Sequence, residues 1–156
     1  EDIKPLLPKI LGYILSFVYV AIYWNNHHHL FHAVQKVNGK ILWANSHLLF
    51  WLSLVPFTTA WIGENYDAKL PVIAYGVVLL FCAIAYFILQ SVIIKSHDNS
   101  FSLRKVVGSD RKGKISIGCY ILGIACSFLN TWLGIAFYVI VAIMWLIPDK
   151  RIEENL

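Results

Sequence analysis

The chain alternates between long apolar runs and short polar segments. Four runs contain no Asp, Glu, Lys or Arg: residues 10–35, 41–63, 70–94 and 115–148. About 18 consecutive apolar residues are enough to predict a membrane-spanning helix, and in hydrocarbon each backbone polar group must bond within its own segment. The pattern therefore predicts an all-α integral membrane protein.

The run lengths predict how many times this single domain, residues 1–156, crosses the bilayer. Each of the first three runs suits one crossing, with a kink in the second at Pro56 because proline lacks an N–H. The fourth run would span roughly 50 Å as one helix, so we expect two helices hinged at Asn130 and Thr131. Five spans are predicted: about 8–33, 41–62, 70–94, 115–129 and 131–148, with a cytoplasmic loop at 95–114.

The basic residues predict the orientation. Five crossings put three cations on one side (Lys4, Lys9 and Lys69) and ten on the other: Lys36, Lys40, Lys95, Arg104, Lys105, Arg111, Lys112, Lys114, Lys150 and Arg151. The positive-inside rule places the ten in the cytoplasm, so the chain begins outside and its C-terminus is cytoplasmic. An outside start without a signal-peptide pattern predicts a sixth helix upstream of Glu1.

Composition excludes several function classes. Only 14% of residues are charged, against about 25% in soluble domains. The net charge of +4 comes from loop cations without a basic face, so no nucleic-acid partner is expected. The three cysteines lie in apolar runs and form no disulfide framework. No P-loop, nucleophile elbow or carboxylate pair occurs, so an enzyme is not expected.

Polar side chains gather where the first predicted span ends. Four histidines follow one another closely there (His27, His28, His29 and His32), and Asn45 and His47 lie at a similar depth in the next span. Hydrogen bonding to neighbouring helices and interfacial water is the favoured interpretation. His28 and His32 are four residues apart, as metal or haem ligands can be. Proton sensing by imidazole is a third possibility.

The same two spans carry a family resemblance. The residues concerned are Trp24, Asn26-His27-His28, Leu30-Phe31, Leu42-Trp43-x-Asn45 and Pro56-Phe57-x-Thr59-Ala60-x-x-Gly63. Together they resemble the lysosomal potassium channel family in its prokaryotic six-helix branch. The resemblance implies a homotetrameric cation channel whose first helix lines the pore and carries a Phe-Ser-Asp motif. That helix corresponds to the one expected upstream of Glu1, so the pore-lining residues are unknown.

The resemblance also implies roles for individual residues. His27, His28 and Asn45 would orient the Ser and Asp of the upstream motif, and Asn26 would belong to the same polar network. Trp24 and Trp43 would pack beside it. His29 stands where a basic residue such as Arg is expected, which changes the charge of the cluster.

The expected function is passive, potassium-selective conduction by a multi-pass homotetramer in a prokaryotic plasma membrane. Potassium would be the permeating ion, with no resident metal or cofactor. The carbonyl-filter string Thr-Val-Gly-Tyr-Gly is absent, so selectivity would have another origin. Two alternatives remain: a membrane metal or haem protein that uses the histidines, and a secondary transporter, although no internal repeat is evident.

Overall fold

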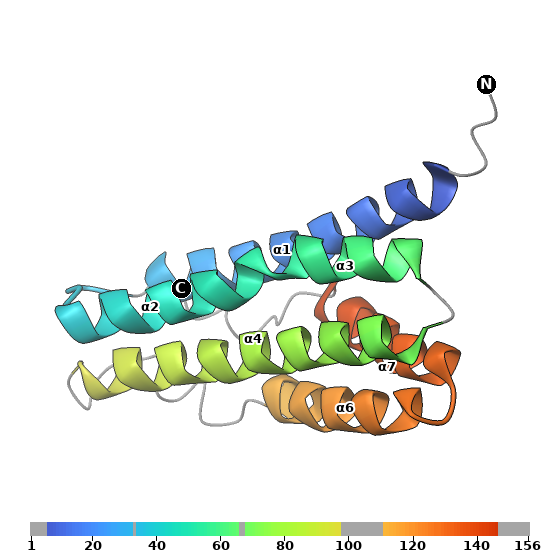
Figure 1. Cartoon of the computed structure of the whole chain (residues 1–156). Helices are drawn as coiled ribbons and strands as arrows, with labels where there is room; N and C mark the ends of the chain where they lie inside the picture. The colour runs from blue at the N-terminus through green and yellow to red at the C-terminus, as the bar shows by residue number, and fades with distance from the viewer. Residues whose placement is uncertain (1–5, 33, 66–67, 98–110, 147–156) are drawn as a thin grey trace.

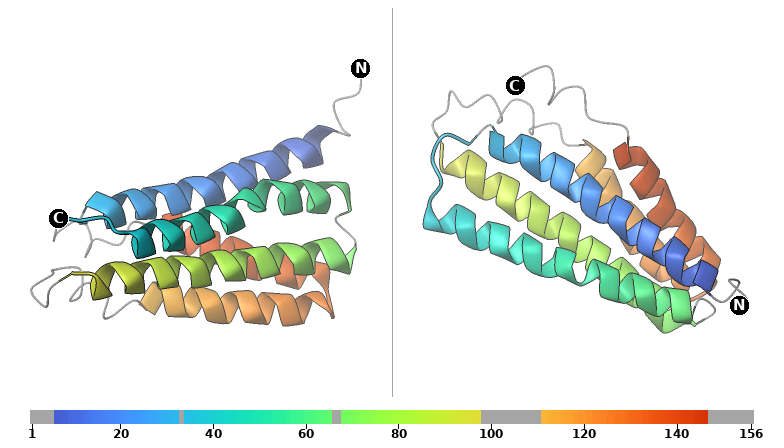
Figure 2. Two further views of the ribbon diagram at one scale, coloured as in Figure 1. Left: turned by 60° about the vertical axis from the view of Figure 1, so that its left-hand side comes forward. Right: turned by 90° about the horizontal axis from the view of Figure 1, so that it is seen from above.

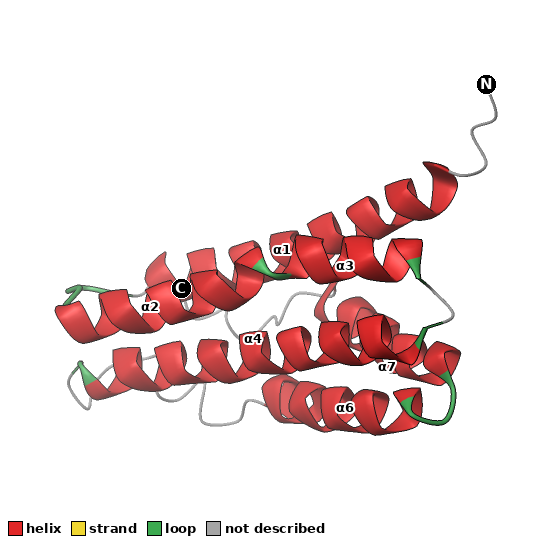
Figure 3. Cartoon of the chain, viewed as in Figure 1, coloured by secondary structure: helices red, strands yellow, loops and turns green. Residues whose placement is uncertain are grey.

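The computed structural model describes residues 6–32, 34–65, 68–97 and 111–146. These residues form helices and short connections and contain no strand (Figure 1, Figure 3). The prediction of an all-α membrane protein is confirmed. The helices are α1 (Leu7–His32), α2 (Gly39–Ser53), α3 (Val55–Glu64), α4 (Lys69–Lys95), α6 (Arg111–Ser127) and α7 (Thr131–Leu146).

The helices form a bundle of five antiparallel rods, because α2 and α3 continue one another (Figure 1, Figure 2). Helix α4 is central: it packs against α2, α3, α6 and α7, whereas α1 packs against α3 and α7. The segment Gly39–Glu64 and helix α4 are each long and apolar enough to cross a membrane, and α7 is a shorter apolar helix. Helix α1 has 26 residues, about 39 Å, but its last turns are polar.

The second rod is interrupted at Leu54, between α2 and α3. Pro56 lies in the first turn of α3, and its missing N–H and its ring break the helical ladder in the turn before it. Two threonine hydroxyls bond to the carbonyls near the break. Thr58 Oγ1 donates to Leu54 O at 3.0 Å, and Thr59 Oγ1 donates to Val55 O at 2.6 Å. The predicted kink is therefore a break two residues before the proline.

The long fourth run folds as the separate helices α6 and α7. Asn130 Oδ1 accepts a hydrogen bond from the backbone N–H of Trp132 at 2.8 Å, which caps the start of α7. Helix α6 begins at Arg111, so residues 111–114, expected in the loop, are helical. Residues 98–110 of that loop and residues 147–148 of the last predicted span lie outside the described residues.

The described cations separate into two groups. Six lie at the end of the bundle where α1 and α4 finish and α6 begins, which we call the cationic end: Lys36, Lys40, Lys95, Arg111, Lys112 and Lys114. Lys69 lies at the opposite end, where its Nζ donates to Phe128 O at the end of α6 at 2.7 Å. Lys4, Arg104, Lys105, Lys150 and Arg151 fall outside the described residues, as does the side chain of Lys9.

Buried tyrosines form the centre of the bundle. Tyr19, Tyr75, Tyr120 and Tyr138 are each at most 2% exposed and come from α1, α4, α6 and α7. The Tyr75 ring meets the Tyr19 and Tyr138 rings edge-on, at centroid distances of 6.0 and 5.7 Å. Tyr19 Oη donates to Tyr138 O, and Tyr138 Oη donates to Val72 O at 3.3 Å. The Tyr120 ring lies 6.3 Å from that of Tyr138, so these contacts join α1, α4, α6 and α7.

Glycines allow the helices around this tyrosine layer to approach closely. A Cβ atom on Gly76 would lie 2.0 Å from Tyr138 Oη, and one on Gly134 would lie 1.9 Å from Ser127 Oγ and 2.9 Å from Gly123 O. Glycine therefore fits where the ring of Tyr138 lies against α4 and where α7 crosses α6.

Candidate functional site

The candidate site centres on a contact between α1 and α2. Helix α1 carries His27 near its end, and the chain reverses through a short connection in which Asn38 caps α2, its Oδ1 accepting from Ile41 N at 3.1 Å. This reversal brings Asn45 beside His27, with Nε2 and Oδ1 2.7 Å apart. Because an amide oxygen only accepts, the imidazole donates through its Nε2–H.

Aromatic rings hold the His27 imidazole in place. The ring of Trp24 is stacked on one side at 6.0 Å with an interplanar angle of 17°, and the ring of Phe31 on the other at 4.4 Å and 28°. Residues three and four positions apart share a helix face, which explains why these three rings meet. Trp24 nevertheless remains 65% exposed within the single chain.

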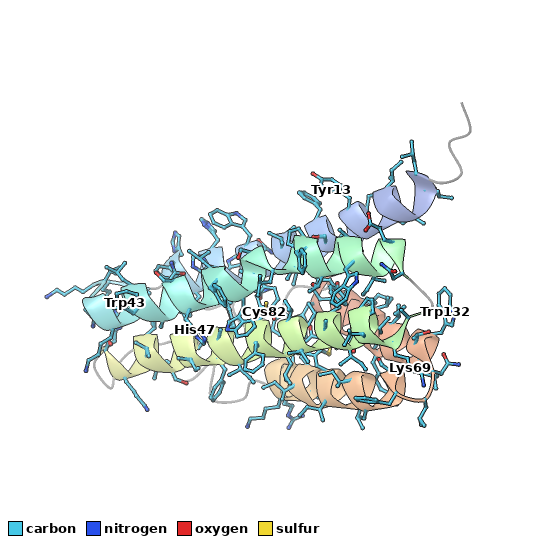
Figure 4. All side chains as sticks on the ribbon, viewed as in Figure 1. Tyr13, Trp43, His47, Lys69, Cys82 and Trp132 are labelled. Carbon is cyan, nitrogen blue, oxygen red and sulfur yellow. The ribbon has the colours of Figure 1, made fainter. Side chains whose placement is uncertain are left out.

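The structure places the other predicted site residues apart from this pair. Asn26 lies beside α4, where its backbone carbonyl accepts a hydrogen bond from Tyr86 Oη at 3.1 Å. The amide nitrogen of Asn26 donates to Ile22 O at 2.8 Å, within its own helix. His28 is on the exposed side of α1. Trp43 is 79% exposed on α2, so it does not pack beside His27 within one chain (Figure 4).

The remaining histidines do not converge on a metal site in the described part of the chain. The rings of His28 and His32 have centroids 6.3 Å apart, and no third His, Cys, Asp or Glu side chain completes a ligand set among the described residues. His47 instead accepts a hydrogen bond from Trp51 Nε1 at 3.0 Å, and the Trp51 ring is stacked on that of Phe81 of α4 at 4.3 Å. The described side chains of the site can form hydrogen bonds to a polar partner, but they do not form a set of metal ligands.

Two features of the site were not apparent from the sequence. Tyr23 and Tyr86 meet edge-on at 6.1 Å behind the polar cluster and connect α1 to α4. The spacing of Tyr19 and Tyr23, four residues apart on one helix face, was an available signal. The second feature is a set of exposed polar side chains within runs that otherwise suit lipid: Asn25 and His28 on α1, and Ser46, His47 and Ser53 on α2.

Comparison with known proteins identifies the family. The family model described as endosomal/lysosomal potassium channel TMEM175 matches residues 1–56, which include the whole of α1 and α2. A protein named as a potassium channel from Chryseobacterium is 56% identical over 155 residues, which cover 99% of this chain and 81% of that protein.

Two more distant relatives are also named potassium channels. One, from Chamaesiphon minutus, is 24% identical over 92% of this chain and 73% of its own length, and the other, from Streptomyces collinus, is 28% identical over 51% and 40%. No solved structure matches the chain. The near-complete match at 56% identity shows that the chain belongs to the endosomal/lysosomal potassium channel TMEM175 family.

Proposed function

We propose that the chain is a subunit of a potassium-selective channel that conducts K⁺ passively down its gradient. The observation that carries this proposal is the 56% identity, over nearly the whole chain, to a protein named as a potassium channel. The role is conduction and not catalysis, with K⁺ as the permeating ion and no resident metal or cofactor.

The pore is formed by a further helix upstream of Glu1, in a homotetramer. Polar side chains that face lipid inside a span are costly, so the exposed Asn25 and His28 of α1 and Ser46 of α2 favour a protein element that covers them. The match to the Chryseobacterium relative leaves about a fifth of that protein unmatched, enough for such a segment. The His27–Asn45 pair, which joins α1 to α2, supports and orients the added helix.

The channel lies in a prokaryotic plasma membrane with its cationic end and C-terminus in the cytoplasm. The unequal distribution of Lys and Arg supports this orientation, because the cytoplasmic side of membrane proteins is enriched in these residues. The two ends of a five-rod bundle lie on opposite faces, so an upstream sixth helix brings both termini to the cytoplasmic side.

A flux assay in liposomes tests both the channel function and the proposal that the upstream helix forms the pore. The product of the complete reading frame is expected to pass K⁺ and to exclude anions, because the long apolar runs of this chain contain no Lys or Arg. The 156-residue chain alone is expected to give no selective flux, because it lacks the helix that chooses the ion. The measurement is proton uptake through an ionophore driven by a K⁺ gradient. Equal K⁺-selective flux from both forms would contradict the upstream pore helix, and no flux from the complete product would contradict the channel.

A further inference from the structure

A cavity lies between α1, α4, α6 and α7, on the opposite side of α1 from the face expected to meet the upstream helix. Its volume is about 180 Å³. Its walls are mainly aromatic and aliphatic, among them Tyr23, Phe87, Ile117, Tyr120 and Trp145. An apolar cavity of about 150 Å³ admits benzene, so this one has room for a short hydrocarbon segment.

One edge of the cavity is basic. Lys114 lines it directly, together with Ser116 and Asn26. Lys112 lies over the ring of Trp145, itself part of the wall, with Nζ 5.8 Å from the centroid. The indole nitrogen of Trp145 donates to Ser116 Oγ at 2.8 Å, which ties the wall to the first turns of α6. The basic edge is therefore built on two packed helices.

The charge of this edge is suited to an anion. Its lysines lie in the first turn of α6, where the helix dipole is positive and cations are unfavourable. Even with Asp110 counted, residues 110–114 contain three cations against one carboxylate, a net charge of +2. Lys114 is exposed, so an anion can reach it from outside the bundle.

We propose that this cavity binds an anionic phospholipid, with its phosphate held by Lys114 and Lys112 and the start of one acyl chain inserted between Tyr23, Phe87 and Tyr120. An apolar chamber beside a basic edge matches a molecule that carries both parts, and the cationic end is the one proposed to face the anionic cytoplasmic leaflet. The site lies within one subunit and does not depend on the pore, so a failure of K⁺ conduction leaves it standing.

The test compares lipid binding by variants of the complete protein in mild detergent. Native mass spectrometry gives the affinity for phosphatidylglycerol and for phosphatidylcholine with the same chains, and thermal unfolding gives the accompanying stabilisation. The wild type is expected to prefer phosphatidylglycerol. Lys114→Gln should lower its affinity about fivefold, as expected for one lysine near an anionic headgroup. Lys40→Gln, at the same end but away from the cavity, should change it less.

Substitutions that fill the cavity distinguish lipid binding in this site from general electrostatic attraction of lipid to the protein surface. Ala83 and Ala142 both line the cavity, whereas Ala136 is exposed elsewhere on α7. Ala83→Leu or Ala142→Leu should reduce phosphatidylglycerol binding at least fivefold without changing any charge, and Ala136→Leu should not. Equal binding of the two lipids by the wild type, or unchanged binding by both cavity-filling variants, would overturn the proposal. Stabilisation by glycerophosphoglycerol, which has the headgroup but no acyl chains, equal to that by the lipid would likewise overturn it.

Discussion

Replacing Gly76 by alanine is expected to destabilise the bundle by about 1–3 kcal/mol, the range for inserting atoms into a packed core. The new Cβ would lie 2.0 Å from Tyr138 Oη and 2.6 Å from its Cζ. The Tyr138 ring has little room to move, because its hydroxyl bonds to Val72 O and its edge meets Tyr75. The measurement is the thermal or denaturant-induced unfolding of the purified protein in detergent.

Two further variants make this test specific. Gly118→Ala is the matched control, because nothing lies within 4 Å of its added Cβ, and it should leave stability unchanged or slightly raised. Tyr138→Phe removes the hydroxyl that Gly76→Ala strikes, so the double variant should be less destabilised than the two single losses combined. Equal stability of Gly76→Ala and Gly118→Ala would show that α4 and α7 do not pack as described.

His27→Ala and Asn45→Ala are each expected to cost about 1–3 kcal/mol, because each leaves a partly buried polar group without its partner. The bond between Nε2 and Oδ1 is 2.7 Å long and joins α1 to α2. Loss of His27 also removes the ring between Trp24 and Phe31, so it should be the more damaging substitution. A double-mutant cycle on unfolding in detergent isolates the contact itself.

The control for this cycle is His28→Ala. The cycle and its control are measured on the 156-residue chain, in which no upstream helix covers α1; His28 is exposed there and lies away from Asn45, so its loss should cost less than about 0.5 kcal/mol. A coupling energy near zero between His27 and Asn45 would contradict their direct bond. If His28→Ala lowered the free energy of unfolding more than His27→Ala, the arrangement of the two histidines described here would be wrong.

The helices could be predicted from the sequence because the distribution of charge marks their ends. Residues without charge in runs of this length have few alternatives to a membrane helix. The separation of α6 from α7 could also be predicted, because one straight helix would be far longer than the bilayer is thick. The start of α6 could not be predicted, since Arg111–Lys114 are helical although they are mostly charged. Helices continue past the hydrocarbon, where hydropathy gives no signal.

The site was only partly predictable because helix rotation decides which neighbours meet. Successive residues differ by about 100° around a helix. His27 therefore meets Asn45 while the adjacent His28 is exposed and Asn26 turns toward α4. The resemblance to a channel family directed attention to α1 and α2, but it could not fix this rotation. The tyrosine layer depends on contacts among four helices, and no local pattern in the sequence specifies which rings will meet.

The central proposal, that this chain is a subunit of a potassium-selective channel, is tested most directly by the reversal potential of the complete protein in a planar bilayer. With a KCl gradient across the membrane, the reversal potential is expected to lie close to the potassium equilibrium potential. When K⁺ on one side is replaced by Na⁺, the reversal potential should move to a value that corresponds to a higher permeability for K⁺ than for Na⁺. A reversal potential at the chloride equilibrium potential, or the absence of any current from protein that is folded and assembled, would contradict the proposal.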